Sequence, residues 1–332
     1  MTLRRFFATI AALAVIVAII VGVGWLVSLD SMRSEIEDSV ERARAAGYEV
    51  TYDDLDIGGY PWRMVVAVTR PSVARPESDG AVSWRWSAPR IYSETFMFDQ
   101  APGIAFTLPE TQRLDYGGRI MEMTVKRGVV VYTPPSVARE SLAVEADGIA
   151  LVTPGGLFTL DSLTGLIRRG SETVIEVEID GRDLTLAPRT KAFLGREISV
   201  IGVTASHDGD LPEALSGPAL AAWSTGGGTV EFERLNLEWG TIEIAAEGTL
   251  TLDGDLRPEA AFSAEIAGYG GLLDLLAESG GMKPRDASFA KTFLNLMAKT
   301  TSGRRVIKVA LTAQNGTLYV GPLPLIKLAP VY

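Results

Sequence analysis

The sequence predicts a mainly β protein, in which an N-terminal transmembrane helix precedes a large antiparallel β-sheet that is apolar on one side. Three observations lead to this prediction. An uncharged apolar run opens the chain, apolar and polar residues then alternate through most of the sequence, and Gly, Pro or Asp turn signals separate the alternating runs. Three or four short helices cannot cover so many one-sided strands. We therefore expect the sheet either to curl into a groove or to fold on itself as a sandwich.

The segment from Phe6 to Leu29 is long enough to cross a membrane as one helix. It holds no charged residue, and roughly 20 apolar residues span the hydrocarbon core of a bilayer. Arg4 and Arg5 precede it and acidic residues follow it, which predicts a cytoplasmic tip at residues 1–5 and an exported remainder. A cleaved signal peptide is the alternative. It is disfavoured because the apolar run is longer than a signal core and lacks a small-x-small cleavage site.

Residues 30–47 predict a stalk helix between the anchor and the body. Ser31 or Asp30 can cap its start and Gly47 ends it. Its apolar stripe comprises Met32, Ile36, Val40 and Ala43, which we expect to pack on the first strands. Residues 48–332 then form a single β-rich body, with a possible subdivision near residues 205–228.

Runs of alternating apolar and polar residues mark the strands of this body. In its first part they are Tyr48–Asp53, Met64–Thr69, Val82–Trp86, Ile91–Phe98, Ile104–Leu108, Gln112–Tyr116, Ile120–Val125 and Val129–Thr133. Later they are Glu172–Asp180, Thr241–Leu252, Phe262–Ile266, and a C-terminal hairpin of Val306–Gln314 and Thr317–Val320 that turns at Asn315-Gly316. The tail Pro322–Pro330 is predicted to be extended and apolar.

Three short helices are predicted within the body. They are Leu211–Ser224, the leucine-rich Tyr269–Ser279, and a helix from Asp286 or Ser288 to Lys299. The apolar stripe of the last helix comprises Phe289, Phe293, Leu296 and Met297.

Composition excludes several classes of function. A formal net charge of −10 disfavours binding to nucleic acid phosphates. The chain has no cysteine and a single histidine, so thiolate sites and two-histidine metal sites are impossible. That histidine, His207, lies beside Asp208 in a sequence typical of an exposed turn, and no G-x-S-x-G elbow accompanies it. We therefore expect a non-enzymatic protein without a metal or a cofactor. An envelope hydrolase that uses His207 is kept as a third hypothesis.

If the sheet forms a groove, its apolar and aromatic strand positions are the candidate ligand-lining residues. The candidates are Trp62, Arg63, Trp84, Trp86, Ile175, Val177, Ile179, Trp239, Ile242, Ile244, Leu250 and Leu252. In a closed sandwich the same apolar side chains would simply form core. The turn Gly59–Arg63 has the same two interpretations: its aromatic residues either plug the core, or contact a lipid while Arg63 meets a phosphate.

Several short motifs carry a resemblance to a known family. Gly59-Tyr60-Pro61-Trp62-Arg63, the segment Leu237–Gly240 with the strand Glu247–Leu252, and the ending Thr312–Pro324 resemble domain of unknown function 2125, a family of alphaproteobacterial envelope proteins. The anchor followed by a one-sided sheet also looks like the AsmA-like proteins of Gram-negative envelopes, which are associated with outer-membrane assembly and phospholipid movement along a β-groove. The resemblance implies an inner-membrane protein with a periplasmic body.

We therefore expect a protein of envelope biogenesis that binds phospholipid or another apolar ligand in a β-groove. The alternative is a structural scaffold with a closed sandwich core and other envelope proteins as partners. The identity of the ligand and the oligomeric state do not follow from the sequence.

Overall fold

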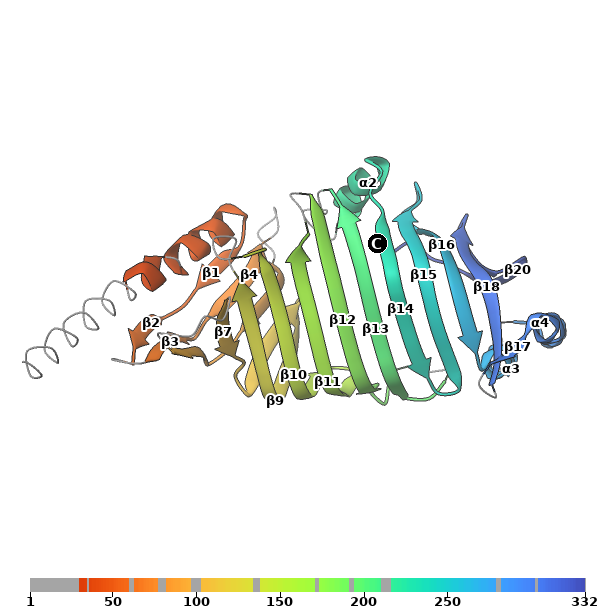
Figure 1. Cartoon of the computed structure of the whole chain (residues 1–332), viewed down its shortest axis with the longest axis horizontal. Coiled ribbons are helices and arrows are strands. Elements are labelled where there is room, and N and C mark those ends of the chain that lie inside the picture. Colours follow the sequence, from red (N-terminus) through yellow and green to blue (C-terminus); the bar gives the residue numbers. More distant parts are fainter. Residues whose placement is uncertain are drawn as a thin grey trace, which may run out of the picture. The chain divides into compact units, whose positions relative to one another are not determined.

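The computed structural model is mainly β, with antiparallel strands and a few short helices, as the sequence predicts (Figure 1). It describes residues 30–34, 36–59, 63–76, 82–96, 103–133, 138–170, 173–190, 194–209, 216–278, 282–301 and 304–331. The predicted transmembrane segment, Phe6 to Leu29, lies outside the described residues. Among the residues that are described, no helix combines the length and apolarity needed to span a bilayer.

The chain divides into two compact units, Met1–Val131 and Tyr132–Tyr332. Residues 205–228, where the sequence suggests a subdivision, lie inside the second unit.

The first unit contains the stalk helix, eight short strands and most of a ninth, longer strand. The strands are β1 Glu49–Thr51, β2 Asp54–Gly58, β3 Arg63–Thr69, β4 Ser72–Pro76, β5 Val82–Ser87, β6 Arg90–Phe96, β7 Ile104–Thr107, β8 Thr111–Tyr116 and β9 Arg119–Thr133. They pair in the order β2-β3-β6-β7-β9-β8-β5-β4-β1. The two strands predicted at 120–125 and 129–133 are one continuous strand, β9, because backbone pairing runs through Gly128.

The predicted stalk helix covers residues 30–34 and 36–45. Met32 and Ile36 from its apolar stripe pack against the buried side chains of Leu55, Met64 and Val66. Burial of this stripe, rather than the propensity of the isolated segment, holds the helix on the strands.

The second unit is an antiparallel meander of long strands, drawn from green to blue in Figure 1. Its strands are β10 Ser141–Thr153, β11 Gly156–Arg169, β12 Val174–Thr185, β13 Glu197–Asp208, β14 Val230–Trp239, β15 Ile242–Leu252, β16 Pro258–Ala267, β17 Lys299–Thr301, β18 Arg304–Gln314, β19 Thr317–Val320 and β20 Leu323–Lys327. Each strand from β10 to β16 pairs with the next, β16 pairs with β18, and β18 leads through β19 to β20.

The described strands of this unit form an open sheet, because no pairing joins β10 to β20. The sheet is therefore not closed on itself. Helices take the place of a second sheet over the C-terminal strands: α3 Tyr269–Glu278 and α4 Pro284–Met297. A further helix, α2 Gly217–Thr225, lies before β14. It begins later than the predicted Leu211, with Ser216 accepting a capping hydrogen bond from the Ala219 amide.

Register makes one face of the sheet apolar and the other charged. On the apolar face, Ile266 pairs with Ile244 on one side and with Ile307 on the other. The opposite face carries cross-strand ion pairs, such as that between Asp180 and Arg234, whose carboxylate and guanidinium groups form two hydrogen bonds of 2.7 and 2.9 Å. The hydrogen bonds from Arg234 lower the pKa of Asp180 below its usual value. The predicted one-sided pattern is confirmed in these strands.

The sequence analysis did not predict strands β2, β4, β10, β11, β13, β14 and β17. Apolar residues occupy both faces of β10, with Ala146 on one face and Ile149 and Leu151 on the other, so simple alternation is lost. The end of β13, around His207, is rich in Asp and Gly and was interpreted as a turn. Tertiary pairing overrides this local signal.

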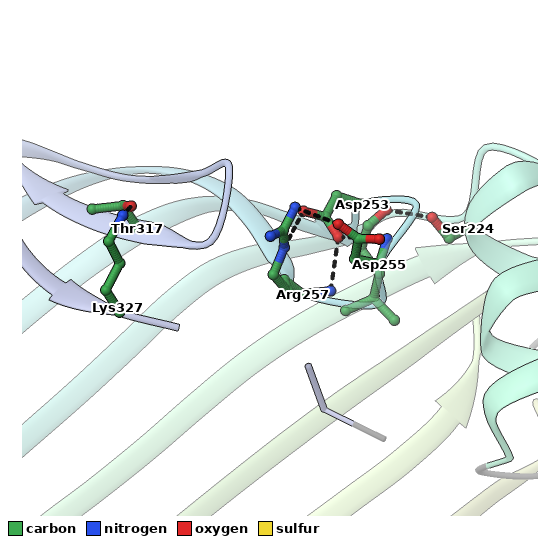
Figure 2. A network of polar contacts seen from close by, with 7 residues as sticks. Ser224, Asp253, Asp255, Arg257, Thr317 and Lys327 are labelled. Carbon is green, nitrogen blue, oxygen red and sulfur yellow. Dashed lines mark hydrogen bonds and ion pairs between the residues drawn. The ribbon is translucent and has the colours of Figure 1, made fainter. Parts of the chain in front are cut away.

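Backbone conformation and side-chain hydrogen bonds define the turns at the C-terminal end of the sheet. Asn315 and Gly316 both have positive φ, 52° and 65°, as a two-residue hairpin requires, which confirms the predicted β18–β19 turn. The predicted apolar tail forms β20, which pairs along β19. At the β15–β16 turn, the carboxylate of Asp253 accepts hydrogen bonds from the backbone amides of Asp255 and Arg257 and from the Arg257 side chain (Figure 2).

Candidate functional site

An apolar cavity lies under the α3–α4 hairpin. It is a cavity of about 600 Å³ between these two helices and the apolar face of strands β15, β16, β18 and β19. The side chains around it are Ile244, Ile266, Tyr269, Leu272, Leu273, Met282, Lys283, Asp286, Phe289, Ala290, Leu294, Ile307, Leu311, Leu318, Val320 and Pro324. All of them belong to the second unit.

The floor of the cavity is a direct product of strand register. Ile244, Ile266 and Ile307 come from three neighbouring strands and lie side by side because they pair directly with one another. Ile307 is 1% exposed and Ile266 is 7% exposed. Alternation in each strand points these three side chains away from the charged face.

Gly268 directs the chain from β16 into α3, which forms part of the cavity roof. Its φ is +73°, and a Cβ atom at this position would overlap the carbonyl oxygen of Thr241. Only glycine combines this backbone conformation with so close an approach. The turn therefore places Leu273, on the next turn of α3, over the sheet, where it is 3% exposed.

Polar contacts fix the two roof helices to each other. The Tyr269 hydroxyl donates a 2.9 Å hydrogen bond to Oδ1 of Asn295, and Lys291 Nζ lies 2.7 Å from a carboxylate oxygen of Asp274. Tyr269 is buried, so its hydrogen bond satisfies a phenol that would otherwise be desolvated without a partner. The hairpin is thus held as one element.

Among the described residues of the cavity wall, the charged ones lie at the start of α4. Lys283 and Asp286 line the cavity and are exposed to solvent, as is Phe289, of which 64% is accessible. This side of the cavity is its mouth, because its lining residues also reach the surface. A ligand with an apolar body and a polar end would match this arrangement.

The structure corrects the prediction for α4. The helix begins at Pro284 and ends at Met297, and the residues that it buries are Ala287, Ala290 and Leu294. From the stripe predicted by the sequence, Phe289, Leu296 and Met297 are exposed. The helix carries two apolar stripes. The sequence pattern predicted burial of the bulkier one, whereas the structure buries the stripe of smaller residues.

Several predicted ligand-lining residues lie on the apolar face of the second unit, and one lines the cavity. Ile244 is that residue, whereas Ile242 is 2% exposed at the start of β15 and Leu252 is buried at its end. The remaining predicted residues on this face, outside the cavity lining, are Ile175, Val177, Ile179 and Leu250. Trp239 is half-buried, and its indole Nε1–H donates a 2.8 Å hydrogen bond to the carbonyl of Gly195.

The other predicted residues belong to the first unit, so they do not line this cavity. Trp84 is half-buried near the ring of Tyr48. Trp86 donates a 2.9 Å hydrogen bond to Gln112 Oε1 and borders a smaller cavity of about 200 Å³ beneath the stalk helix. Arg63 forms a 2.9 Å ion pair with Glu94. Trp62 lies outside the described residues.

His207 does not lie in the exposed turn that the sequence predicts. It is on β13 and 6% exposed. Its Nδ1 lies 2.8 Å from the carbonyl oxygen of Thr229, and Trp223 Nε1–H donates a 3.4 Å hydrogen bond to Nε2. Both ring nitrogens therefore have structural partners, which is the arrangement of a satisfied core histidine.

Sequence reasoning missed the residues that α4 and the C-terminal strands contribute to the cavity. Ala290 and Leu294 were absent from the predicted stripe. Leu311 was assigned to an apolar strand face, as was Ile266, without a signal that these faces meet a helix. The available signal was the leucine-rich α3 sequence next to a second apolar helix. Two such helices in succession indicate a helical hairpin whose apolar side packs on another apolar surface, such as the sheet.

The comparisons with known proteins place the chain in a family. No curated protein matches it, and no finding supports the looser likeness to AsmA-like proteins. The model of an uncharacterised family of proteins conserved in bacteria, DUF2125, matches residues 25–329. This match covers most of both compact units and all the described residues that line the cavity. The chain therefore belongs to the DUF2125 family.

Proposed function

We propose that this protein binds the acyl chain of a lipid, or a similarly apolar ligand, in the cavity beneath the α3–α4 hairpin. One observation carries the proposal: the cavity of about 600 Å³ is lined by apolar side chains, apart from Tyr269 and the pair Lys283 and Asp286 at its mouth. Its volume falls within the range of roughly 300–1,000 Å³ that is typical of small-molecule sites.

The size of the cavity argues against an ordinary packing defect. Protein cores contain few voids larger than a water molecule. Here the void adjoins the largest buried cluster of the second unit, which includes Leu273, Leu294 and Ile307. An apolar cavity of this kind does not attract ordered water, because water needs polar partners. An apolar ligand would supply the missing contacts.

The apolar face beyond the cavity supports the wider proposal of a β-groove. Along this face, Val177 pairs with Ala205 and with Ile167, and Ile179 pairs with Val203. Ile167 and Ile179 remain 47% and 40% exposed. Apolar side chains that stay accessible in a continuous row are expected for a surface that contacts lipid, whereas a packed core would bury them.

The biological setting is part of the same proposal. We place Phe6 to Leu29 in the inner membrane as a single uncleaved anchor, with residues 1–5 in the cytoplasm and the body in the periplasm, because Arg4 and Arg5 precede the apolar run. In that setting the protein acts in envelope biogenesis without catalysis, and a phospholipid is the most abundant ligand of the required chemistry.

Native mass spectrometry of the full chain in detergent tests the proposal. The wild type is compared with Ala290→Phe, which obstructs the cavity, and with Thr164→Phe, a change at an exposed position of β11 that pairs with Asp180 on the charged face. We expect one lipid per chain to survive detergent exchange in the wild type and in Thr164→Phe, but not in Ala290→Phe. Thermal unfolding checks that all three are folded.

Two results would overturn the proposal. One is a wild type that carries no retained lipid even after incubation with phospholipid. The other is equal retention by Ala290→Phe, which would assign the lipid to another surface. Either outcome leaves the alternative of a scaffold that binds envelope proteins through its surface.

A further inference from the structure

The outer side of α4 exposes a cluster of large apolar side chains. Phe289, Leu296 and Met297 are 64%, 83% and 42% exposed, and positions separated by seven or eight residues lie on the same side of a helix. The buried side is formed by the smaller residues Ala287 and Ala290, together with Leu294. A soluble surface rarely gathers such residues unless it meets a partner.

This helix is also the basic part of an acidic protein. Residues 282–305 contain six Lys or Arg residues and one acid, Asp286, while the whole chain has a net charge of −10. Lys283 and Arg285 are at the start of α4, and Lys299 and Arg305 follow its end; all four are exposed. Cations therefore flank the exposed apolar side at both ends of the helix.

Charge decides which partner this surface fits. A symmetric contact with a second copy of the chain would bring the same basic patch against itself, and like charges repel. An anionic lipid surface offers complementary charge together with an apolar layer beneath it. A helix with apolar side chains on one side and Lys or Arg around it is typical of segments that lie in a membrane interface.

We propose that α4 docks on an anionic lipid membrane, with Phe289, Leu296 and Met297 entering the interface and Lys283, Arg285, Lys299 and Arg305 meeting the headgroups. This inference goes beyond ligand binding, because α4 docks whether or not the cavity is filled. It also deepens the proposed function: Phe289 belongs both to the cavity mouth and to the docking surface, so docking brings the mouth to the lipid.

A site-specific fluorescent label on α4 tests this proposal in the full chain. Because the chain has no cysteine, Thr292→Cys at an exposed position of α4 gives a single attachment point for an environment-sensitive dye. The labelled protein is placed in phosphatidylcholine nanodiscs and mixed with vesicles of phosphatidylcholine alone or with phosphatidylglycerol. A second preparation has phosphatidylglycerol in the nanodisc itself.

We expect a blue shift of the dye emission with phosphatidylglycerol, in the vesicle or in the nanodisc, and none with phosphatidylcholine alone. In this background, Leu296→Ser with Met297→Ser should lower the apparent affinity at least about tenfold. Arg285→Gln with Lys299→Gln should lower it by about fivefold per charge. None of these four positions lines the cavity, so lipid retention in the mass spectrometry experiment should persist.

Matched controls are Ile120→Ser, at a residue that is 47% exposed on β9, and Arg113→Gln with Arg119→Gln at exposed positions of the first unit. Both should bind like the parent. The absence of a shift in either phosphatidylglycerol preparation would overturn the proposal. So would a shift without anionic lipid that grows with protein concentration, because it would identify a second copy of the chain as the occupant. The dye shift reports on docking, and lipid retention in mass spectrometry reports on ligand binding. A protein that loses the shift but retains its cavity lipid therefore fails in docking alone.

Discussion

Ala290→Leu is expected to stabilise the ligand-free protein, because the larger side chain would grow into the cavity. Ala290 is 5% exposed and lines the cavity from α4. Leucine adds three carbons, and burial of each contributes about 0.8 kcal/mol, or about 2.4 kcal/mol together. Lost side-chain entropy and a slightly lower helix propensity offset about 1 kcal/mol of this. The free energy of unfolding should therefore rise by about 1–2 kcal/mol.

Ala287→Leu provides a matched control on the same helix. Ala287 is also 5% exposed and belongs to the same buried cluster, but it is not one of the residues that line the cavity. Added carbons at a fully packed position force neighbouring side chains apart, which costs about 1–3 kcal/mol. The same chemical change should thus alter stability with opposite sign at two positions three residues apart.

Denaturant unfolding of the delipidated full chain, followed by circular dichroism, gives the two free energies and shows whether the denaturant dependence is unchanged. If Ala290→Leu lowers stability as much as Ala287→Leu, the space beside Ala290 is filled by protein atoms and the cavity argument fails. If it raises stability, the same variant should also compete with lipid for the cavity.

Three further predictions concern residues that position the elements. His207→Ala should lower the free energy of unfolding by about 1–3 kcal/mol, because it leaves buried hydrogen-bond partners unsatisfied; a variant as stable as the wild type would contradict this. Gly268→Ala should destabilise the protein by more than about 1 kcal/mol, because its φ of +73° and the nearby Thr241 carbonyl exclude a Cβ atom, and thermal unfolding measures the loss. The folded-state pKa of Asp180 is lowered by Arg234 from an ordinary value of 3.8. The pair therefore stabilises the fold above that pH, and its contribution is lost as the pH falls through the lower folded pKa. The stability difference between the wild type and Asp180→Asn should shrink on acidification, and a difference that grows would refute this assignment.

Local patterning was sufficient for most strands and for α3. Ile242 to Leu252 alternates as predicted because each strand needs only one buried face, and that need is visible in the sequence itself. The hairpin turn at Asn315-Gly316 is equally local, since two consecutive residues with positive φ require this residue pair. The strand β13 was missed around His207, because its polar and glycine-rich end forms a strand only through pairing with its neighbours.

The cavity could not be predicted from the alternation of apolar and polar residues along the sequence. Ile244 was a candidate ligand residue, but whether it meets another sheet, solvent or a helix depends on contacts with residues far along the chain. Which of the two apolar stripes of α4 is buried also depends on contacts with residues far along the chain. The helix carries Phe289 and Leu296 on one side and Ala290 and Leu294 on another, and hydrophobicity favours burial of both.

The sequence by itself determined that this protein is a one-sided antiparallel β structure of the DUF2125 family, because alternation, turn residues and family motifs are properties of short segments. Only the tertiary structure decided that the sheet of the second unit stays open, that α3 and α4 cover its C-terminal strands, and that a cavity remains between them. The physical reason is that packing is a property of two surfaces. The small side chain of Ala287 lets α4 pack in the buried cluster, while the bulky stripe stays outside and the cavity remains beside Ala290.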